Sequence, residues 1–317
     1  MGGLMSAKWT AEQIPEQRGR TAIVTGANSG LGLASARELA RHGADVVLAC
    51  RNLEKGVAAQ REIEALAPTT RVELAELDLA SLASVQAFAE TFLAEHDGLD
   101  LLLNNAGVMA PPRRETADGF ELQFGTNVLG HFALTGRLIG AMEGRTDARV
   151  VTLSSNAHKM GKIKLDDLQS ERGYRRWSAY GQSKLGDLMI SLELDRRLRA
   201  AGSTVTSVAA HPGYAATNLQ TAAAPLIDRL VMRATNVLVA QSADMGALST
   251  LYAASAPGVR GGSYIGPDGF GEFRGHPHVV SPSGAARDEQ TATRLWAACE
   301  ELTGVRFELA DAAGSRA

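Results

Sequence analysis

The sequence predicts a doubly wound α/β fold, in which helices cover both faces of a parallel sheet. From residue 21 onward, short apolar runs typical of buried strands alternate with longer segments of helical periodicity. The strands are expected at residues 21–25, 45–49, 72–76, 99–103, 149–153, 204–209 and 262–265. The helices are expected at residues 31–42, 53–66, 82–95, 119–142, 179–201 and 243–254. No repeat or low-complexity linker divides the chain, so one domain over residues 21–310 with about seven strands is predicted.

The composition excludes several classes of protein. Of the 317 residues, 45% are hydrophobic and 21% are charged, which is typical of a folded protein and not of a disordered one. The 32 Lys and Arg residues nearly balance the 35 Asp and Glu residues, so neither nucleic acid nor an anionic membrane is expected as the main partner. Cys50 and Cys299 are too few for a disulfide framework or a zinc site. After an N-terminal extension over residues 1–20, we expect a soluble, cytoplasmic protein without a membrane span.

A glycine-rich turn follows the first predicted strand and leads directly into a helix. It consists of Thr25-Gly26-Ala27-Asn28-Ser29-Gly30-Leu31-Gly32. The three glycines allow the backbone to turn tightly and to approach a pyrophosphate, whose charge is stabilised by the free N–H groups at the start of the helix. The turn therefore predicts a dinucleotide site formed by Gly26, Asn28, Ser29, Gly30, Leu31 and Gly32.

The end of the second predicted strand indicates which dinucleotide binds. About 20 residues after the glycines, an NAD-binding protein usually carries an acidic residue that binds the ribose hydroxyls. This chain has Cys50 there, followed by Arg51, whose guanidinium suits a 2′-phosphate. We therefore expect NADP(H) with Arg51 in its site. The alternative is that Arg51 is a solvated charge at the end of a strand.

Further motifs in register resemble those of the short-chain dehydrogenase/reductase family. Beside the glycine turn they are Asp78-Leu79, Asn104-Asn105-Ala106-Gly107, Asn127, Ser154-Ser155, Tyr180-x-x-x-Lys184 and Pro212-Gly213. The resemblance spans residues 21–218 and implies a Rossmann-type oxidoreductase domain. Within the family, residues 49–52, 127–132 and 302–304 are most similar to the retinol dehydrogenase and protochlorophyllide reductase-like branch, which commonly uses NADP(H).

The resemblance implies the rest of the cofactor site. Its adenosine side would be formed by Asp78, Leu79, Asn105, Ala106 and Gly107. Its nicotinamide side would be formed by Pro212, Gly213 and Thr217. The Asp78 carboxylate would hydrogen-bond the adenine, or it would cap the next helix, a role that Ser81 can also fill.

Two residues in one predicted helix are expected to perform the proton transfer. Tyr180 and Lys184 are four positions apart, so their side chains share one face and the ammonium stabilises a phenolate. By the resemblance, Ser155 would hold the substrate oxygen, with the adjacent Ser154 as the alternative. Asn127 would hold a water that links Lys184 to solvent, or it would be a buried amide in a distorted helix.

These residues predict an NADP(H)-dependent enzyme that interconverts an alcohol and a carbonyl. Its catalytic residues are expected to be Asn127, Ser155, Tyr180 and Lys184. Reduction of a carbon–carbon double bond and non-catalytic NADP(H) sensing are the alternatives. No metal is expected, because His276-Pro277-His278 lacks a third ligand at a suitable spacing, and His211 is expected to be structural.

The segment near residues 214–241 suggests the chemistry of the substrate. Its apolar residues recur with helical spacing and its basic residues are few, which favours an apolar carbonyl or alcohol covered by a flap. The alternative is that this face packs on the core or on a neighbouring subunit. By the family resemblance, we also expect a homodimer or homotetramer.

Overall fold

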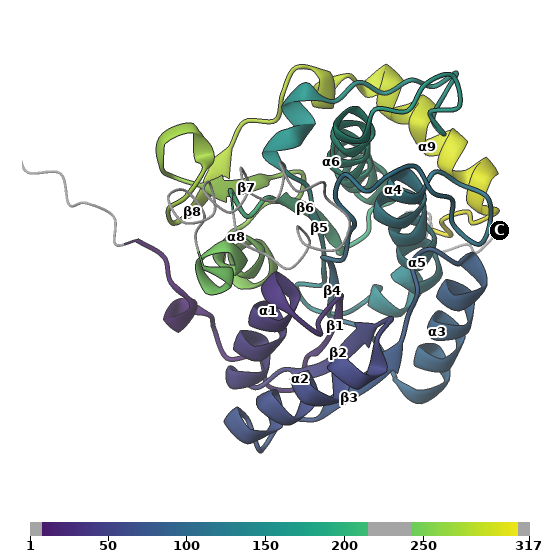
Figure 1. Cartoon of the computed structure of the whole chain (residues 1–317). Coiled ribbons are helices and arrows are strands. Elements are labelled where there is room, and N and C mark those ends of the chain that lie inside the picture. The colour runs from purple at the N-terminus through teal and green to yellow at the C-terminus, as the bar shows by residue number, and fades with distance from the viewer. Residues whose placement is uncertain (1–7, 215–241, 310–317) are drawn as a thin grey trace, which may run out of the picture.

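The computed structural model describes residues 8–214 and 242–309, which form an eight-stranded sheet between two layers of helices (Figure 1). The strands are β1 (Thr21–Thr25), β2 (Asp45–Cys50), β3 (Val72–Glu76), β4 (Leu101–Asn104), β5 (Arg149–Leu153), β6 (Thr206–Ala210), β7 (Tyr264–Pro267) and β8 (Pro277–Val280). Their order across the sheet is β3-β2-β1-β4-β5-β6-β7-β8. The first seven are parallel, whereas β8 pairs antiparallel with β7. The predicted doubly wound α/β fold is confirmed.

Helices pack on both faces of this sheet. One layer contains α1 (Gly30–Arg41), α2 (Leu53–Leu66) and α8 (Ala243–Ser255), and the other contains α3 (Leu82–Glu95), α5 (Gly130–Leu138), α6 (Arg176–Ala200) and α9 (Glu289–Thr303) (Figure 1). Successive strand residues point to opposite faces, so Ile23 of β1 packs in the second layer while Val24 packs in the first. Among the helices of the described segments, none has the length and apolar character needed to cross a membrane.

The helix expected at residues 119–142 is shorter and interrupted. Gly119 has a φ of 83° and belongs to a turn, so the helix begins only with α4 (Leu122–Phe124). It continues through a π-helical turn, η2 (Gly125–Leu129), into α5 and ends in the 3-10 helix η3 (Ile139–Met142). The π-helical turn places Asn127 at the irregular point of the helix, where functional residues often occur.

Two elements near the C-terminus were not predicted from the sequence. Strand β8 has four residues and begins with Pro277, which an edge strand tolerates at its first position. Helix α9 follows Asp288, whose side chain accepts a hydrogen bond from Thr291 N at 3.1 Å, and it buries Leu295 and Trp296. A capping residue before apolar residues at helical spacing was therefore a signal for α9.

The topology places the site at the carboxyl ends of the central strands. From β1 the chain proceeds to β2 and β3 on one side, and then crosses over to β4 and β5 on the other. The carboxyl ends of these parallel strands meet where the strand order reverses, which is the position at which doubly wound sheets bind ligands.

Candidate active site

Most of the predicted cofactor residues line one cleft at the carboxyl ends of the strands, with a volume of about 380 Å³. From the glycine turn and the later loops, the cleft contains Gly26, Asn28, Ser29, Gly30, Leu31, Gly32, Arg51, Asp78, Leu79, Asn105, Ala106 and Gly107. It also contains residues that sequence reasoning missed, among them Thr25, Asn52, Lys55 and Thr126. The strand order explains the convergence, because the ends of β1, β2, β3 and β4 are neighbours in the sheet.

The glycine turn has no room for a side chain where α1 begins. A Cβ atom on Gly32 would lie 2.4 Å from Gly26 O and 2.6 Å from Asn105 Nδ2. Gly26 itself has a φ of 67°, in the left-handed region that favours glycine. Asn105 Nδ2 donates to Thr25 O at 2.7 Å and so ties the loop after β4 to the turn. The first N–H groups of α1 lie at the cleft, an arrangement that fits a pyrophosphate.

Basic side chains lie in the part of the cleft that follows β2. Arg51 Nη1 is 3.9 Å from Asp78 Oδ1, and the Arg51 side chain is 69% exposed. Lys55 of α2 lines the same cleft. Asp78 does not cap α3, because that role belongs to Ser81, whose Oγ accepts from Ser84 N. The Asp78 carboxylate binds Ala80 N within its own loop and remains beside Arg51.

A second pocket, of about 110 Å³, adjoins the cleft and contains Ser155, Tyr180 and Lys184, three of the predicted catalytic residues. We call it the chemical pocket. The two cavities share Leu31, Asn105, Gly107 and Val108. The pocket is also lined by Met109, Leu153, Ser154, Ser155, Tyr180, Lys184, Pro212, Gly213 and Tyr214. A phenol, an ammonium and a serine hydroxyl therefore meet in a largely apolar chamber beside the cofactor cleft.

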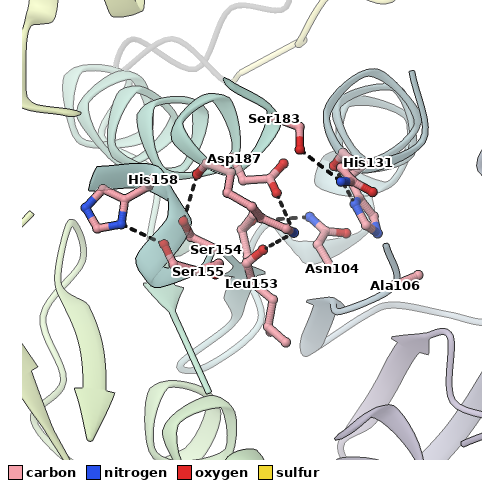
Figure 2. A network of polar contacts seen from close by, with 12 residues as sticks. Asn104, Ala106, His131, Leu153, Ser154, Ser155, His158, Ser183 and Asp187 are labelled. Atoms are coloured by element: carbon pink, nitrogen blue, oxygen red, sulfur yellow. Dashed lines mark hydrogen bonds and ion pairs between the residues drawn. The ribbon is translucent and has the colours of Figure 1, made fainter. Parts of the chain in front are cut away.

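The two adjacent serines have different hydrogen bonds. Ser154 is buried, and its hydroxyl donates to Lys184 O at 2.7 Å, which joins the end of β5 to α6 (Figure 2). Ser155 lies at the start of the 3-10 helix η4 (Asn156–Met160), where its Oγ accepts from Ala157 N at 3.2 Å. Because the Ser155 oxygen acts as an acceptor there, its O–H remains available to a ligand in the pocket.

The buried carboxylate of Asp187 holds the Lys184 ammonium in place. Its Nζ donates to Leu153 O at 2.9 Å and to Asp187 Oδ2 at 2.8 Å, and the Lys184 and Asp187 side chains are 7% and 3% exposed (Figure 2). Burial alone would lower the pKa of Lys184, but the Asp187 charge and hydrogen bond and the nearby Tyr180 raise it. Burial raises the pKa of Asp187 despite the neighbouring ammonium. Sequence reasoning missed Asp187, although its i,i+3 spacing from a lysine was a usable signal.

Hydrogen bonds to its side chain and to its main-chain oxygen hold Asn127 within the irregular helix. Oδ1 accepts from Val108 N at 2.8 Å, and Nδ2 donates to Val108 O and to Ser183 Oγ at 3.0 Å each. Its main-chain oxygen accepts from His131 Nδ1 at 2.8 Å. Asn127 is thus a buried amide within the distorted helix, and its role in linking Lys184 to solvent stays a prediction.

His131 connects this helix to the glycine turn. Its Nδ1 must carry the proton, because it faces the Asn127 carbonyl, and its Nε2 then accepts from Thr25 Oγ1 at 3.0 Å. Burial lowers the pKa of His131 to about 4, and the Lys184 charge adds to this effect. The hydrogen bond to Asn127 O raises the pKa but is outweighed. The His131 ring is therefore neutral in the folded protein near pH 7.

We expect His131 to make folding sensitive to acid. Because its pKa falls from 6.5 to about 4 on folding, its contribution is present above pH 6.5 and is lost as the pH falls through 4. The shift corresponds to about 3 kcal/mol of unfolding free energy. Denaturant unfolding from pH 7.5 to pH 4 should show a flatter curve for His131→Gln than for the unmodified protein. His42→Gln, at the end of α1, is the control, and parallel curves for the unmodified protein and His131→Gln would contradict this role.

The turn at residues 211–213 is supported by a loop that sequence reasoning did not connect with the site. His211 is fully buried, its Nδ1 accepts from Gly213 N at 3.3 Å and its Nε2 lies 3.1 Å from Glu272 Oε2. Tyr214 N donates to Phe273 O at 2.7 Å. The close contact with His211, followed by the hydrogen bond from Lys159, lowers the pKa of Glu272 to about 2. The expected structural role of His211 thus includes holding the Pro212-Gly213 turn.

The other residues considered in the sequence lie outside the described segments or bind elsewhere. Thr217 and residues 215–241 of the expected flap lie outside the described residues. His276 and His278 each contact a main-chain oxygen, of Trp9 and Gly266 respectively, at 3.0 Å. Within residues 8–214 and 242–309, the one cluster with metal-ligand spacing is Glu73, Glu95 and His96, where Arg71 already pairs with Glu73.

Comparison with known proteins identifies the family. The family model described as short chain dehydrogenase matches residues 20–226, which is more than half of the chain. The chain belongs to the short-chain dehydrogenase family. It is therefore an NAD(P)-dependent dehydrogenase or reductase, as the sequence motifs predicted.

Similar proteins include vertebrate enzymes and a bacterial structure. Retinol dehydrogenase 12 from Homo sapiens is 42% identical over 301 residues, which cover 94% of this short-chain dehydrogenase and 90% of the human protein. Polyprenol dehydrogenase from Mus musculus is 43% identical over 298 residues, covering 92% and 86% of the two chains. The crystal structure of an uncharacterized protein from Mycobacterium paratuberculosis is 46% identical, with a TM-score of 0.79 and coverage of 95% and 99%. The retinol dehydrogenase relatives support the retinol dehydrogenase-like branch of the family.

Proposed function

We propose that this short-chain dehydrogenase is an NADP(H)-dependent oxidoreductase that interconverts an alcohol and a carbonyl on an apolar substrate. The observation that carries the proposal is the pocket in which Ser155, Tyr180 and Lys184 meet beside the cofactor cleft. When bound, the nicotinamide accepts or supplies the hydride. Relatives named retinol dehydrogenase and polyprenol dehydrogenase support an apolar alcohol as the substrate class.

Each polar residue of the pocket would have its own role in the reaction. The Ser155 O–H would hold the substrate oxygen, on which negative charge develops during carbonyl reduction. The Tyr180 hydroxyl would donate its proton to that oxygen, or accept it in the oxidation direction. The Lys184 ammonium would stabilise the phenolate and bind the ribose through the N–H that Leu153 and Asp187 leave unused. Met109, Leu153 and Pro212 would exclude water from the reacting carbon.

The test of this function is a panel of matched carbonyls and alcohols, followed by NADPH absorbance. We expect turnover with apolar aldehydes or ketones and with the corresponding alcohols. Saturation of a conjugated carbon–carbon double bond without carbonyl reduction would favour the alternative reductase activity. Tight NADPH binding without turnover of any compound would favour a sensing role.

The preference for NADP(H) rests on Arg51 and Lys55 in the cleft and on Cys50 where a carboxylate would select NAD(H). We expect Arg51→Ala to weaken NADPH binding about 10- to 100-fold, the range of a charge-assisted hydrogen bond, and to change NADH binding little. Fluorescence titration of both cofactors measures the effect. Arg61→Ala, which changes an exposed arginine of α2 outside the cleft, is the control. Equal affinities for NADPH and NADH in the unmodified protein would overturn the assignment.

A further inference from the structure

A buried ion pair lies beside the chemical pocket and shares Lys184 with it. Asp187 lies one turn after Lys184 on α6, and the two side chains meet at 2.8 Å with 3% and 7% of their surfaces exposed. Two charges removed from water to this degree are costly unless they are paired and hydrogen-bonded. A neutral residue at position 187 would leave the buried ammonium without a partner, so the carboxylate serves to keep Lys184 charged at this depth.

The contacts of the ammonium show what Asp187 fixes. Of the three N–H donors on Lys184, one points to Leu153 O and one to Asp187 Oδ2. A Cβ atom on Gly107 would lie 3.7 Å from Nζ, so the ammonium lies against the loop after β4 that lines the cofactor cleft. Asp187 and Leu153 therefore hold the ammonium between the cleft and Tyr180.

Asp187 carries the negative charge that balances the Lys184 ammonium. Three further titratable groups face the pair: Tyr180 on α6, His131 on α5 and Cys299 on α9. Burial lowers the pKa of His131 and raises that of Cys299, so both are neutral near pH 7. Tyr180 is a phenol whose charge changes during the reaction. In the described part of the chain, Asp187 is the carboxylate that pairs with Lys184.

A small cavity with a mostly apolar lining adjoins Asp187. It has a volume of about 20 Å³, which is room for about one water molecule. Its polar lining consists of Asn104, His131, Thr135, Thr152, Asp187 and Ser191. Hydroxyl and amide groups near the carboxylate make a lasting charge at this depth feasible.

We propose that Asp187 is a positioning residue for the reaction, which keeps the Lys184 ammonium charged and in place and thereby sets both limbs of the pH–rate profile. The proposal rests on the proposed function of Tyr180 and Lys184. When Asp187 takes up a proton at low pH, the ammonium loses its counter-charge. When Asp187 is replaced by a neutral residue, burial lowers the pKa of Lys184, so the ammonium loses its proton at a lower pH.

The test compares Asp187→Asn with Asp195→Asn. Asp195 is also a buried carboxylate on α6, but it pairs with Arg199, two turns beyond the site. For Asp187→Asn we expect kcat at pH 7 to fall about tenfold or more, with the substrate KM nearly unchanged. Its pH–rate profile should lose the acid limb, and its alkaline limb should move to lower pH. Asp195→Asn should keep the profile of the unmodified enzyme.

Several results would overturn the proposal. One is a pH–rate profile for Asp187→Asn that coincides with that of the unmodified enzyme. Another is a change in thermal stability with kcat and both limbs intact, which would assign Asp187 a structural role. If Asp187→Asn does not fold, Asp187→Glu should retain both limbs, and an unmodified enzyme without any acid limb between pH 5 and 8 would contradict the proposal.

A binding measurement separates this proposal from the proposed function. The NADPH dissociation constant, measured against pH by fluorescence, reports the charge of Lys184 even when no substrate turns over. We expect the affinity of Asp187→Asn to fall at a lower pH than that of the unmodified protein. A failed substrate panel with this shift present would refute the proposed activity alone, whereas turnover with no shift would refute the role of Asp187.

Discussion

Replacing Tyr180 with phenylalanine is expected to lower kcat by about 10³-fold or more, within the range attributed to a positioned acid or base. The substitution removes one oxygen and keeps the ring, which packs edge-on against Trp177 with the centroids 6.1 Å apart. The fold and the cofactor cleft should therefore persist. Stopped-flow and steady-state rates, together with NADPH titration, should show lost turnover and nearly unchanged cofactor affinity.

The matched control for this prediction is Tyr174→Phe. The Tyr174 hydroxyl donates to Pro111 O at 2.8 Å and accepts from Gln123 Nε2 at 2.9 Å, outside the chemical pocket. Its loss should cost about 1 kcal/mol of unfolding free energy and leave turnover largely intact. Normal turnover in Tyr180→Phe would show that another group transfers the proton.

Replacing Gly32 with alanine is expected to weaken NADPH binding by about 100-fold and to lower the melting temperature. The new Cβ would meet Gly26 O at 2.4 Å and Asn105 Nδ2 at 2.6 Å, and neither group can move freely, because Asn105 is bound to Thr25 O. Overpacking of this kind costs about 1–3 kcal/mol, and here it displaces the backbone that would approach the pyrophosphate.

The control for Gly32→Ala is Gly140→Ala in η3, where a Cβ would meet nothing within 4 Å. That variant should bind NADPH as the unmodified protein does. Isothermal titration of both variants makes the comparison. An unchanged dissociation constant for Gly32→Ala would mean that the glycine turn is not the pyrophosphate site.

The cofactor half of the site was accessible from the sequence because its residues act through the local backbone. A strand, a glycine turn and a helix are adjacent along the chain, so the position of Gly26 after the strand and of Gly32 at the start of the helix follows from the pattern itself. Strand order then determines which loops converge. The resemblance to the short-chain dehydrogenase/reductase family, and not the pattern of segments, indicated that Asp78 and Asn105 belong to the same cleft.

The parts that sequence reasoning missed depend either on contacts between distant segments or on burial, which the sequence does not show. Glu272 reaches His211 from 61 positions away, and no local pattern indicates such a pair. Asp187 resembles any helical acid until burial of its neighbour Lys184 is known. The contacts of Asn127 with Val108 and Ser183 likewise depend on the π-helical turn, which the expected uninterrupted helix did not include.

The most direct test of the account is to follow deuterium from the nicotinamide C4 of deuterated NADPH into the product of an apolar aldehyde or ketone. Mass spectrometry and NMR locate the label. If Ser155 and Tyr180 hold and protonate the substrate oxygen as proposed, the deuterium will lie on the carbinol carbon, and Tyr180→Phe will abolish its transfer. Deuterium on a saturated carbon–carbon bond, or transfer that proceeds unchanged in Tyr180→Phe, would contradict the proposed reaction.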